Sequence, residues 1–186
     1  PDGTFGPQQH ITRAEFATIA ALFFHAPEVE DDAFTDISDS WARDYINRAA
    51  KLGLVSGYED GTFKPTKSIT RQEMAVMLYG WMGGGESLLN AETVTAALAK
   101  FTDGADVAPW AQEAVAYCYL AGLMVGNDAG CFDPLGSLER AQLAQVFCSF
   151  YEVALNLVLN AAPDAPEQPS TPEQPSTPEQ PSTPEQ

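Results

Sequence analysis

The feature that most constrains this chain is an internal repeat, because related segments must fold into related units. Residues 1–24, PDGTFGPQQHITRAEFATIAALFF, align without a gap on residues 59–82, EDGTFKPTKSITRQEMAVMLYGWM. Residues 127–150, NDAGCFDPLGSLERAQLAQVFCSF, carry the pattern a third time. A preceding half, FTDISDSWARDYINRAAKLGLVSGY at 34–58, matches residues 101–127 with a two-residue insertion. The chain therefore holds three copies of one pattern, and copy one shows only the second half.

These comparisons divide the chain into segments. We predict a partial repeat at 1–33 (copy one), a repeat at 34–82 (copy two), a hinge and connecting helix at 83–100, a repeat at 101–162 (copy three) and a tail at 163–186. The connecting helix is expected from Ser87 to Lys100, after a Gly-Gly-Gly hinge. The tail repeats Pro, Glu, Gln, Ser and Thr every six residues and has no apolar side chain beyond alanine, which predicts a disordered spacer.

Each full repeat is expected to form a helix, a turn and a second helix. In copy two, Ser40 is placed to cap the first helix and Gly53 to end it, as Gly122 does in copy three. Because one pair of helices cannot bury its own apolar face, the copies must pack on one another. We therefore predict a mainly α protein in which repeated helix-turn-helix units form a bundle.

The second helices begin with recognisable caps. Thr12-Arg13-Ala14-Glu15 and Thr70-Arg71-Gln72-Glu73 are capping boxes, in which the hydroxyl and the carboxylate each satisfy a backbone N–H group. A Phe-x-Pro element precedes each cap, and its aromatic ring is expected to fill the core. These aromatic residues are Phe5, Phe63 and Phe132.

Charge and composition exclude several classes of partner. The chain has 9 Lys and Arg against 26 Asp and Glu, so its net charge is −17. Such a surface repels nucleic acid, and an anionic ligand would need a local cationic site. No apolar run reaches the ~18 residues of a membrane span, so membrane insertion is not expected. The chain opens at Pro1 inside a repeat, so the lack of a signal peptide excludes nothing.

The three cysteines are odd in number and cannot form a closed disulfide framework. Cys118 and Cys148 could face each other across two helices of one unit, whereas Cys131 lies in a turn. The favoured interpretation is that they are small buried apolar residues.

The arginine after each capping position is the most informative polar residue. Arg13, Arg71 and Arg140 all fall in the first turn of a helix, where the helix dipole disfavours a cation. Copy three keeps its arginine although Glu139 and Gln142 replace the Thr and Glu of the capping box. One interpretation is that each arginine pairs with an acid of the neighbouring repeat. The favoured one is that the arginine and the free N–H groups of the helix start hold a carboxylate or phosphate.

Other recurring residues fit a carbohydrate site. Trp41 and Trp110 stand at the start of the first helix of their repeats, where an exposed indole would suit stacking on a sugar, although a tryptophan taken alone is more often core. Ser56-Gly57 and Gly126 come just before the turn, where glycine lets a ligand approach the backbone.

The elements FxDxxxxW, GLVSGYxDGTFxP and ITRxE together resemble the S-layer homology (SLH) domain over roughly residues 1–155. The resemblance implies a pseudo-threefold, three-pronged helical body whose grooves bind secondary cell-wall polymers, often with pyruvylated and hence anionic sugars. It also implies that the arginine, the tryptophan and the glycine-containing segment take part in binding. On this chain these are Arg13 and Arg71 first, then Trp41, Trp110, Ser56, Gly57 and Gly126, with Arg140 in a copy that departs from the pattern.

The resulting expectation is a secreted, monomeric, non-catalytic module that anchors a bacterial surface protein at the cell wall or S-layer by binding an acidic polysaccharide, with no cofactor or metal. Copy three reads LERAQ and copy one lacks its first half, so at most two complete sites are expected.

Two alternatives remain. The chain could be a protein-docking module of a surface complex, or the anchor segment of a wall-acting enzyme whose catalytic domain lies elsewhere. The chain has two histidines, His10 and His25, and no nucleophile elbow, zinc motif or phosphate loop. The acidic turns at 28–32 and 36–39 lack the ligand spacing of an EF-hand and are expected to be solvated acid clusters.

Overall fold

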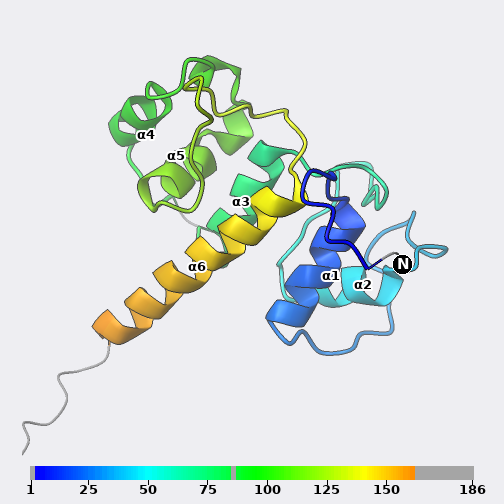
Figure 1. The fold of residues 1–186 in the computed structure, drawn as a ribbon. Coiled ribbons are helices and arrows are strands. Elements are labelled where there is room, and N and C mark those ends of the chain that lie inside the picture. The colour runs from blue at the N-terminus through cyan, green and yellow to red at the C-terminus, as the bar shows by residue number, and fades with distance from the viewer. Residues whose placement is uncertain (1–2, 85–86, 162–186) are drawn as a thin grey trace, which may run out of the picture.

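The computed structural model describes residues 3–84 and 87–161, with side chains described as far as residue 156. The secondary-structure elements of this part are all helical, which confirms the predicted mainly α class (Figure 1). In chain order they are α1 (Arg13–Phe23), α2 (Arg43–Lys51), α3 (Arg71–Trp81), α4 (Ala91–Leu98), the 3₁₀ turns η1 (Gly104–Asp106) and η2 (Pro109–Ala111), α5 (Gln112–Leu120) and α6 (Arg140–Ala161). The tail predicted to be disordered, 163–186, lies outside the described residues.

The two capping boxes predicted from the sequence are present. Thr12 and Thr70 accept a hydrogen bond from the N3 backbone, and the Glu15 and Glu73 carboxylates accept from the capping residues in return. Copy three keeps half of the arrangement, because Gln142 Oε1 accepts a 3.1 Å hydrogen bond from the Glu139 N–H. The local sequence therefore determines where these helices begin.

The starts of the other helices differ from the prediction. α2 begins at Arg43, because Ser40 Oγ accepts from Ala42 N at 3.3 Å and so caps a preceding turn instead of the helix. The helix expected from Ser87 to Lys100 is the shorter α4, which the Asn90 side chain caps by accepting from Thr93 N. Gly53 ends α2 as predicted, with a left-handed φ of 68°.

A closed ring of three backbone hydrogen bonds joins the copies. Ile11 N–H donates to Leu138 O at 2.9 Å, Leu138 N–H to Ile69 O at 3.0 Å, and Ile69 N–H to Ile11 O at 3.1 Å. Each residue belongs to a different copy, and all three are buried. This cyclic pattern is what a pseudo-threefold arrangement requires, and α1, α3 and α6 start close to it (Figure 1).

Aromatic side chains fill the space between the three second helices. Phe16 of α1 stacks on Trp81 of α3 with ring centroids 5.6 Å apart, and Phe147 of α6 contacts both rings edge-on. The first helices lie outside this cluster, with α2 packed on α1 and α5 on α3 (Figure 1). Each peripheral helix therefore covers a second helix of the preceding copy.

The prediction that all three Phe-x-Pro rings fill the core is wrong for copy one. Phe63 and Phe132 are fully buried, but Phe5 is 55% exposed. The buried rings are covered by Phe34 and Phe101, at centroid distances of 5.1 and 5.3 Å. Both covering residues belong to the first half of a repeat, which copy one does not show.

Candidate functional site

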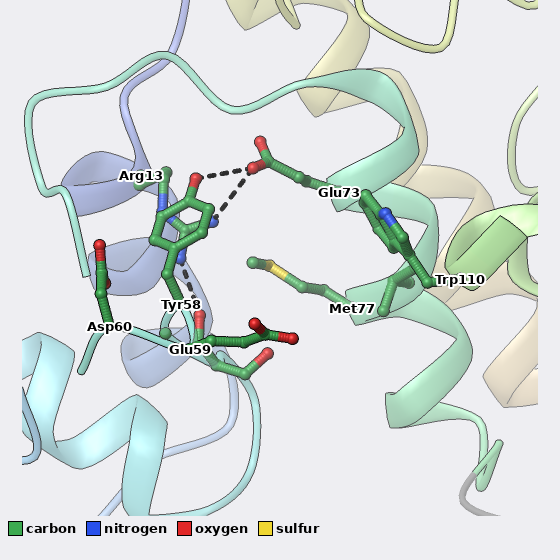
Figure 2. Close-up of a pocket in the computed structure, with 10 residues that line it drawn as sticks. Arg13, Tyr58, Glu59, Asp60, Glu73, Met77 and Trp110 are labelled. Atoms are coloured by element: carbon green, nitrogen blue, oxygen red, sulfur yellow. Dashed lines mark hydrogen bonds and ion pairs between the residues drawn. The ribbon is translucent and has the colours of Figure 1, made fainter. Parts of the chain in front are cut away.

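All three copies contribute to one groove of about 640 Å³, which we name the Arg13 groove (Figure 2). Copy one supplies Arg13 from the start of α1, copy two supplies the loop after α2 and one face of α3, and copy three supplies Trp110 from η2. The volume lies in the range of small-ligand sites. Its lining residues are Arg13, Ser56, Gly57, Tyr58, Glu59, Asp60, Glu73, Val76, Met77 and Trp110.

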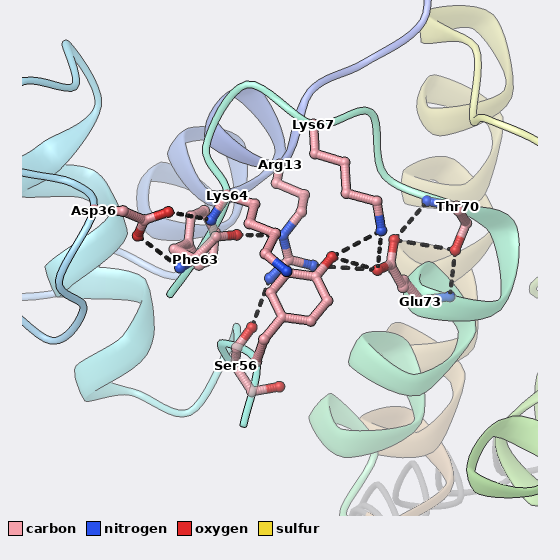
Figure 3. Close-up of polar contacts among 9 residues, drawn as sticks. Arg13, Asp36, Ser56, Phe63, Lys64, Lys67, Thr70 and Glu73 are labelled. Carbon is pink, nitrogen blue, oxygen red and sulfur yellow. Dashed lines mark hydrogen bonds and ion pairs between the residues drawn. The ribbon is translucent and has the colours of Figure 1, made fainter. Parts of the chain in front are cut away.

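Arg13 forms the back of this groove and is only 3% exposed. Its Nε donates to Phe63 O and its Nη2 to Ser56 O, both at 2.7 Å (Figure 3). Its guanidinium carbon lies 4.8 Å from the ring centroid of Tyr58, and Nη1 lies 3.9 Å from Glu73 Oε1. The cation is therefore held mainly by backbone carbonyls of copy two.

The other two arginines repeat this contact. Arg71 donates from Nε to Phe132 O at 2.6 Å and from Nη2 to Val125 O at 2.7 Å. Arg140 donates from Nε to Phe5 O at 2.9 Å and pairs with Glu15 at 3.4 Å. Each arginine thus joins its helix to a neighbouring copy. The sequence suggested an acid of the neighbouring repeat as the partner, but the main partners are backbone carbonyls.

The expectation that free N–H groups of the helix start hold an anion is wrong. The N–H of Arg13 donates to Lys67 O and that of Ala14 to Pro65 O, both at 2.9 Å. The next N–H, of Glu15, donates to the Thr12 hydroxyl. The first amides of α3 and α6 bind carbonyls of a neighbouring copy in the same way. Packing between copies therefore uses the donors that a ligand would need.

A cluster of charges surrounds the Tyr58 ring in the groove. Tyr58 OH donates to Glu73 Oε1 at 2.7 Å, and Lys67 Nζ lies 2.9 Å from the Tyr58 oxygen and 3.0 Å from that carboxylate (Figure 3). Burial alone would raise the pKa of Glu73, but hydrogen bonds from Thr70, Tyr58 and Lys67 outweigh it and lower the pKa. Burial likewise opposes the charge on Lys67, and its hydrogen bonds to Tyr58 and Glu73 raise its pKa.

Lys67 is the charged residue that sequence reasoning missed. Its side chain is 44% exposed, so it presents a cation to solvent where Arg13 does not. Lys64 stands beside it, with Nζ 4.1 Å from the Tyr58 ring centroid and 3.5 Å from Asp60. The two lysines flank the Pro-Thr pair of the FKPTK segment in copy two. Two lysines on one turn of so acidic a chain were the signal in the sequence that could have indicated a cationic site.

The remaining predicted residues are distributed over other pockets. Arg71 and Gly126 line a groove of about 380 Å³, the Arg71 groove, and burial lowers the pKa of Arg71. Arg140 lines an apolar groove of about 520 Å³ with Phe5, the Arg140 groove. Trp41 is 68% exposed and lies with Lys64 in a separate pocket of about 610 Å³. The structure therefore brings together Arg13, Ser56, Gly57 and Trp110, and separates the others from them.

Gly57 serves internal packing. A Cβ atom at this position would collide with the Phe34 ring and lie 2.7 Å from Thr62 O. At Gly126 a Cβ would lie 3.0 Å from Cys131 O. Glycine is required at these positions because the loop lies close to the following turn. The expected approach of a ligand to the backbone is not needed to explain them.

The acidic turns are more than solvated clusters. The Asp36 carboxylate accepts from Phe63 N at 2.7 Å and Lys64 N at 2.8 Å (Figure 3). In copy three, Asp103 accepts the equivalent bonds from Phe132 N and Asp133 N. Lys64 has a left-handed φ of 55°, so Asp36 stabilises a turn that is unfavourable for a residue with a side chain. Across the described residues, no group of three or more His, Cys, Asp or Glu could hold a metal ion.

The cysteines differ from one another in exposure, and all three are free. Cys118 is buried against Ala75 O, and burial raises the pKa of its thiol to about 12. Cys148 is exposed and Cys131 is half-buried, so the interpretation as a buried apolar residue holds for Cys118 and is wrong for the other two. In the part of the chain that the structure describes, no helix is both long and apolar enough to cross a membrane.

Comparison with known proteins identifies the family. The family model described as S-layer homology domain matches residues 1–17, 33–75 and 100–144. The chain belongs to the S-layer homology domain family. The matched ranges confirm the resemblance seen in the repeats, and two of them fall on the full SLH repeats of copies two and three.

Two relatives of this SLH chain carry the names of surface proteins. It is 35% identical over 150 residues to "Cell surface glycoprotein 1" of Acetivibrio thermocellus, which covers 76% of this chain and 6% of that protein. It is 33% identical over 147 residues to "S-layer protein EA1" of Bacillus anthracis, covering 78% and 16%. The chain spans less than a fifth of either relative. The predicted location at the bacterial cell wall or S-layer agrees with these names.

Proposed function

We propose that this SLH chain anchors a secreted bacterial protein non-covalently to the cell wall by binding an acidic, pyruvylated secondary polysaccharide in the Arg13 groove. The observation that carries the proposal is the convergence of Arg13, the Ser56-Gly57 loop and the exposed Trp110 from three separate copies on one groove. Support for anchoring comes from the family and from a relative named "Cellulosome-anchoring protein" of Acetivibrio thermocellus, 42% identical over 84 residues, which are 42% of this chain and 19% of that protein.

The groove offers a sugar two kinds of contact. Trp110 is 60% exposed, so its indole face is open for stacking on the apolar face of a pyranose ring. Beside the groove, Lys67 Nζ lies 3.0 Å from Glu73 of the lining, and this exposed cation supplies positive charge for a ligand carboxylate. We assign Arg13 to the back of the groove, where its 3% exposure leaves it to shape the site and add its charge.

Exposed lysines beside Tyr58 are the cations that so acidic a chain offers to an anionic ligand. Three cations lie close to the Tyr58 ring: Arg13, Lys64 and Lys67. Three acids of the groove lining, Glu59, Asp60 and Glu73, balance them in number, so binding should depend on the exposed lysines and weaken as salt screens them. The described lining of the Arg71 groove includes no tryptophan and the Arg140 groove is apolar, so we expect one strong site per chain.

The test is co-sedimentation of the chain with purified cell-wall sacculi, before and after acid removal of the secondary polymer. Trp110→Ala should weaken binding to untreated sacculi about tenfold, a loss of ~1.4 kcal/mol. Trp41→Ala is the matched control, because it removes a similarly exposed indole outside the groove. Loss of binding on acid treatment, together with a selective effect of Trp110→Ala, supports the proposal.

Other outcomes would replace it. Equal effects of the two tryptophan variants would move the site away from the Arg13 groove. Binding that survives removal of the polymer would favour the protein-docking alternative.

The non-catalytic role is also part of the proposal. Some relatives carry enzyme names, such as "Endoglucanase" of Bacillus sp., and the match covers 15% of that protein.

A further inference from the structure

A small slot adjoins the Arg13 groove near the carboxyl-terminal end of α3. It has a volume of about 280 Å³ and lies between Gly80 of α3 and the loop that follows α2, so we name it the Gly80 slot. Ser56, Val76 and Met77 line both cavities, which places the slot directly beside the groove. A ligand that occupies the groove can therefore extend past these residues into the slot.

Gly80 stands in the last turn of α3, where glycine is unfavourable. Relative to alanine, a glycine costs a helix about 0.5–1 kcal/mol. The left-handed glycine that follows the helix is Gly83, with a φ of 88°, so Gly80 is not needed to end α3. The equivalent positions of α1 and α6 hold Leu22 and Ser149, so the repeat pattern does not require glycine either.

The space beside Gly80 is not used by the described part of the chain. A Cβ atom added there would meet no atom within 4 Å apart from its chain neighbours and the backbone of its own helix. Gly57 differs, because a Cβ atom at that position would collide with the Phe34 ring. Gly80 is exposed and lines the slot, so its missing side chain leaves the slot open.

The chemistry of the slot suits a neutral sugar. Its described lining contains no charged side chain. Leu54 and Val55 are buried and supply an apolar wall for the face of a pyranose ring. The N–H group and the hydroxyl of Ser56 have no hydrogen-bond partner within the described residues, so both are available to sugar hydroxyls. The charged groups gather at the other end of α3, where Lys67 pairs with Glu73.

α3 presents one face to both cavities. Glu73 lines the groove, Met77 lines both cavities, and Gly80 lines the slot, at spacings of four and three residues that share a helix face. Met77 points from α3 into the groove (Figure 2). Seven residues of α-helix span about 10 Å, which is longer than one pyranose ring. A ligand that reaches from Lys67, beside Glu73, to Gly80 therefore has at least two sugar units in a row.

We propose that the Gly80 slot binds a second, neutral sugar unit of the polymer whose anionic unit occupies the Arg13 groove. This inference rests on the proposed function and specifies its ligand as a segment of at least two sugars along α3. The anionic unit lies near Lys67 at the first turn of α3, and the neutral unit lies at the last turn. Because α1 and α6 carry larger residues in place of Gly80, the second subsite belongs to the Arg13 groove alone.

The test uses fragments of one and two sugar units, released from the secondary polymer of purified sacculi and separated by size and charge. Isothermal titration calorimetry with the full chain measures their affinities. We expect the fragment in which a neutral sugar follows the anionic one to bind at least about tenfold more tightly than the anionic sugar alone. Gly80→Leu should remove this gain, so that both fragments bind with similar affinities, because the leucine side chain fills the slot.

The Gly80→Leu variant is expected to fold. Leucine favours helices, and it stands at the equivalent position of α1 as Leu22. Gly80→Ala is the matched control, since it stabilises α3 in the same way but adds only one methyl group. It should keep most of the gain. A gain lost equally in both variants would attribute the effect to the stability of α3 and overturn the proposal.

The remaining outcomes separate this inference from the proposed function. Equal affinities of the two fragments for the unmodified chain would overturn the second subsite and leave the Arg13 groove as a site for one sugar. A gain that persists in Gly80→Leu would place the second sugar outside the slot and would also overturn it. If neither fragment bound, the proposed function itself would fail, and the second subsite with it.

Discussion

Arg13 Nε donates a 2.7 Å hydrogen bond to the carbonyl oxygen of Phe63, fifty residues along the chain and in another copy. The same bond joins Arg71 to Phe132 and Arg140 to Phe5. A cation in the first helical turn is unfavourable for the helix dipole, but here it satisfies carbonyls at the junction between copies. The recurrence of arginine is thus explained by the fold, and a second role in ligand binding is part of the proposal only for Arg13, which lies in the groove.

Arg13→Ala is expected to lower the free energy of unfolding by about 3 kcal/mol, because it leaves the carbonyls of Phe63 and Ser56 without their charged donor in a buried site. Arg140→Ala should cost about 1 kcal/mol, since the Arg140 side chain is 31% exposed and binds one carbonyl. Urea unfolding followed by circular dichroism measures both. Equal losses of stability would contradict the conclusion that Arg13 holds two carbonyls in a more buried site than the one carbonyl held by Arg140.

Local features of the fold were predictable because they depend on neighbouring residues. The capping boxes at Thr12 and Thr70 and the stop at Gly53 involve contacts within a few positions. The failures have the opposite origin. The amides of Arg13 and Ala14 bind carbonyls of another copy, and Phe5 is exposed because its covering half is not present in the described chain.

The sequence predicted which residues form the candidate site better than it predicted which of them lie together. Arg13, Ser56, Gly57 and Trp110 each follow from the repeat pattern, but their common location depends on the cyclic order of the copies. That order is set by long-range backbone hydrogen bonds, which no periodicity in the sequence specifies. Lys67 was missed because its contacts with Tyr58 and Glu73, two residues that line the groove, form only in the folded chain.

Gly57→Ala is expected to destabilise the protein by about 2 kcal/mol or more and to deform the groove, because the new Cβ would meet the Phe34 ring and Thr62 O. Gly80→Ala is the matched control. Gly80 lies in α3, and a Cβ atom added there would meet no atom within 4 Å apart from its chain neighbours and the backbone of its own helix, so alanine should stabilise by about 0.5–1 kcal/mol through helix propensity. Thermal unfolding of the two variants checks the opposite signs, and a Gly57→Ala variant as stable as the unmodified chain would refute this account of Gly57.

Asp36→Ala removes the acceptor of two backbone hydrogen bonds, those of Phe63 and Lys64. We expect a loss of about 2 kcal/mol in the free energy of unfolding, with faster hydrogen exchange at these two amides. Asp39→Ala, an exposed acid of the same turn, should change stability by less than about 0.5 kcal/mol. If both substitutions had the same small effect, the carboxylate of Asp36 would be dispensable for the turn.

Glu113 connects α5 to the segment before α4. Its Oε1 accepts from Tyr79 OH at 2.7 Å, Leu89 N at 3.0 Å, Ser87 Oγ at 2.8 Å and Leu88 N at 2.7 Å. These hydrogen bonds, that from Tyr79 first, lower the pKa of Glu113 from 4.5 to about 2. The ionised form is therefore favoured by folding, so its contribution to stability is complete above a pH of about 4.5 and is lost as the pH falls towards 2.

Glu113→Gln should accordingly lower the melting temperature most near neutral pH, because the amide accepts these hydrogen bonds without the negative charge. The difference from the unmodified chain should shrink as the pH falls from about 4.5 towards 2, where the native carboxylate also becomes protonated. Glu28→Gln, at an exposed loop position, controls for the general loss of one acid. Thermal melts across this pH range measure the effect. A difference that stays constant down to the lowest pH would show that the charge of Glu113 does not hold the segment in place.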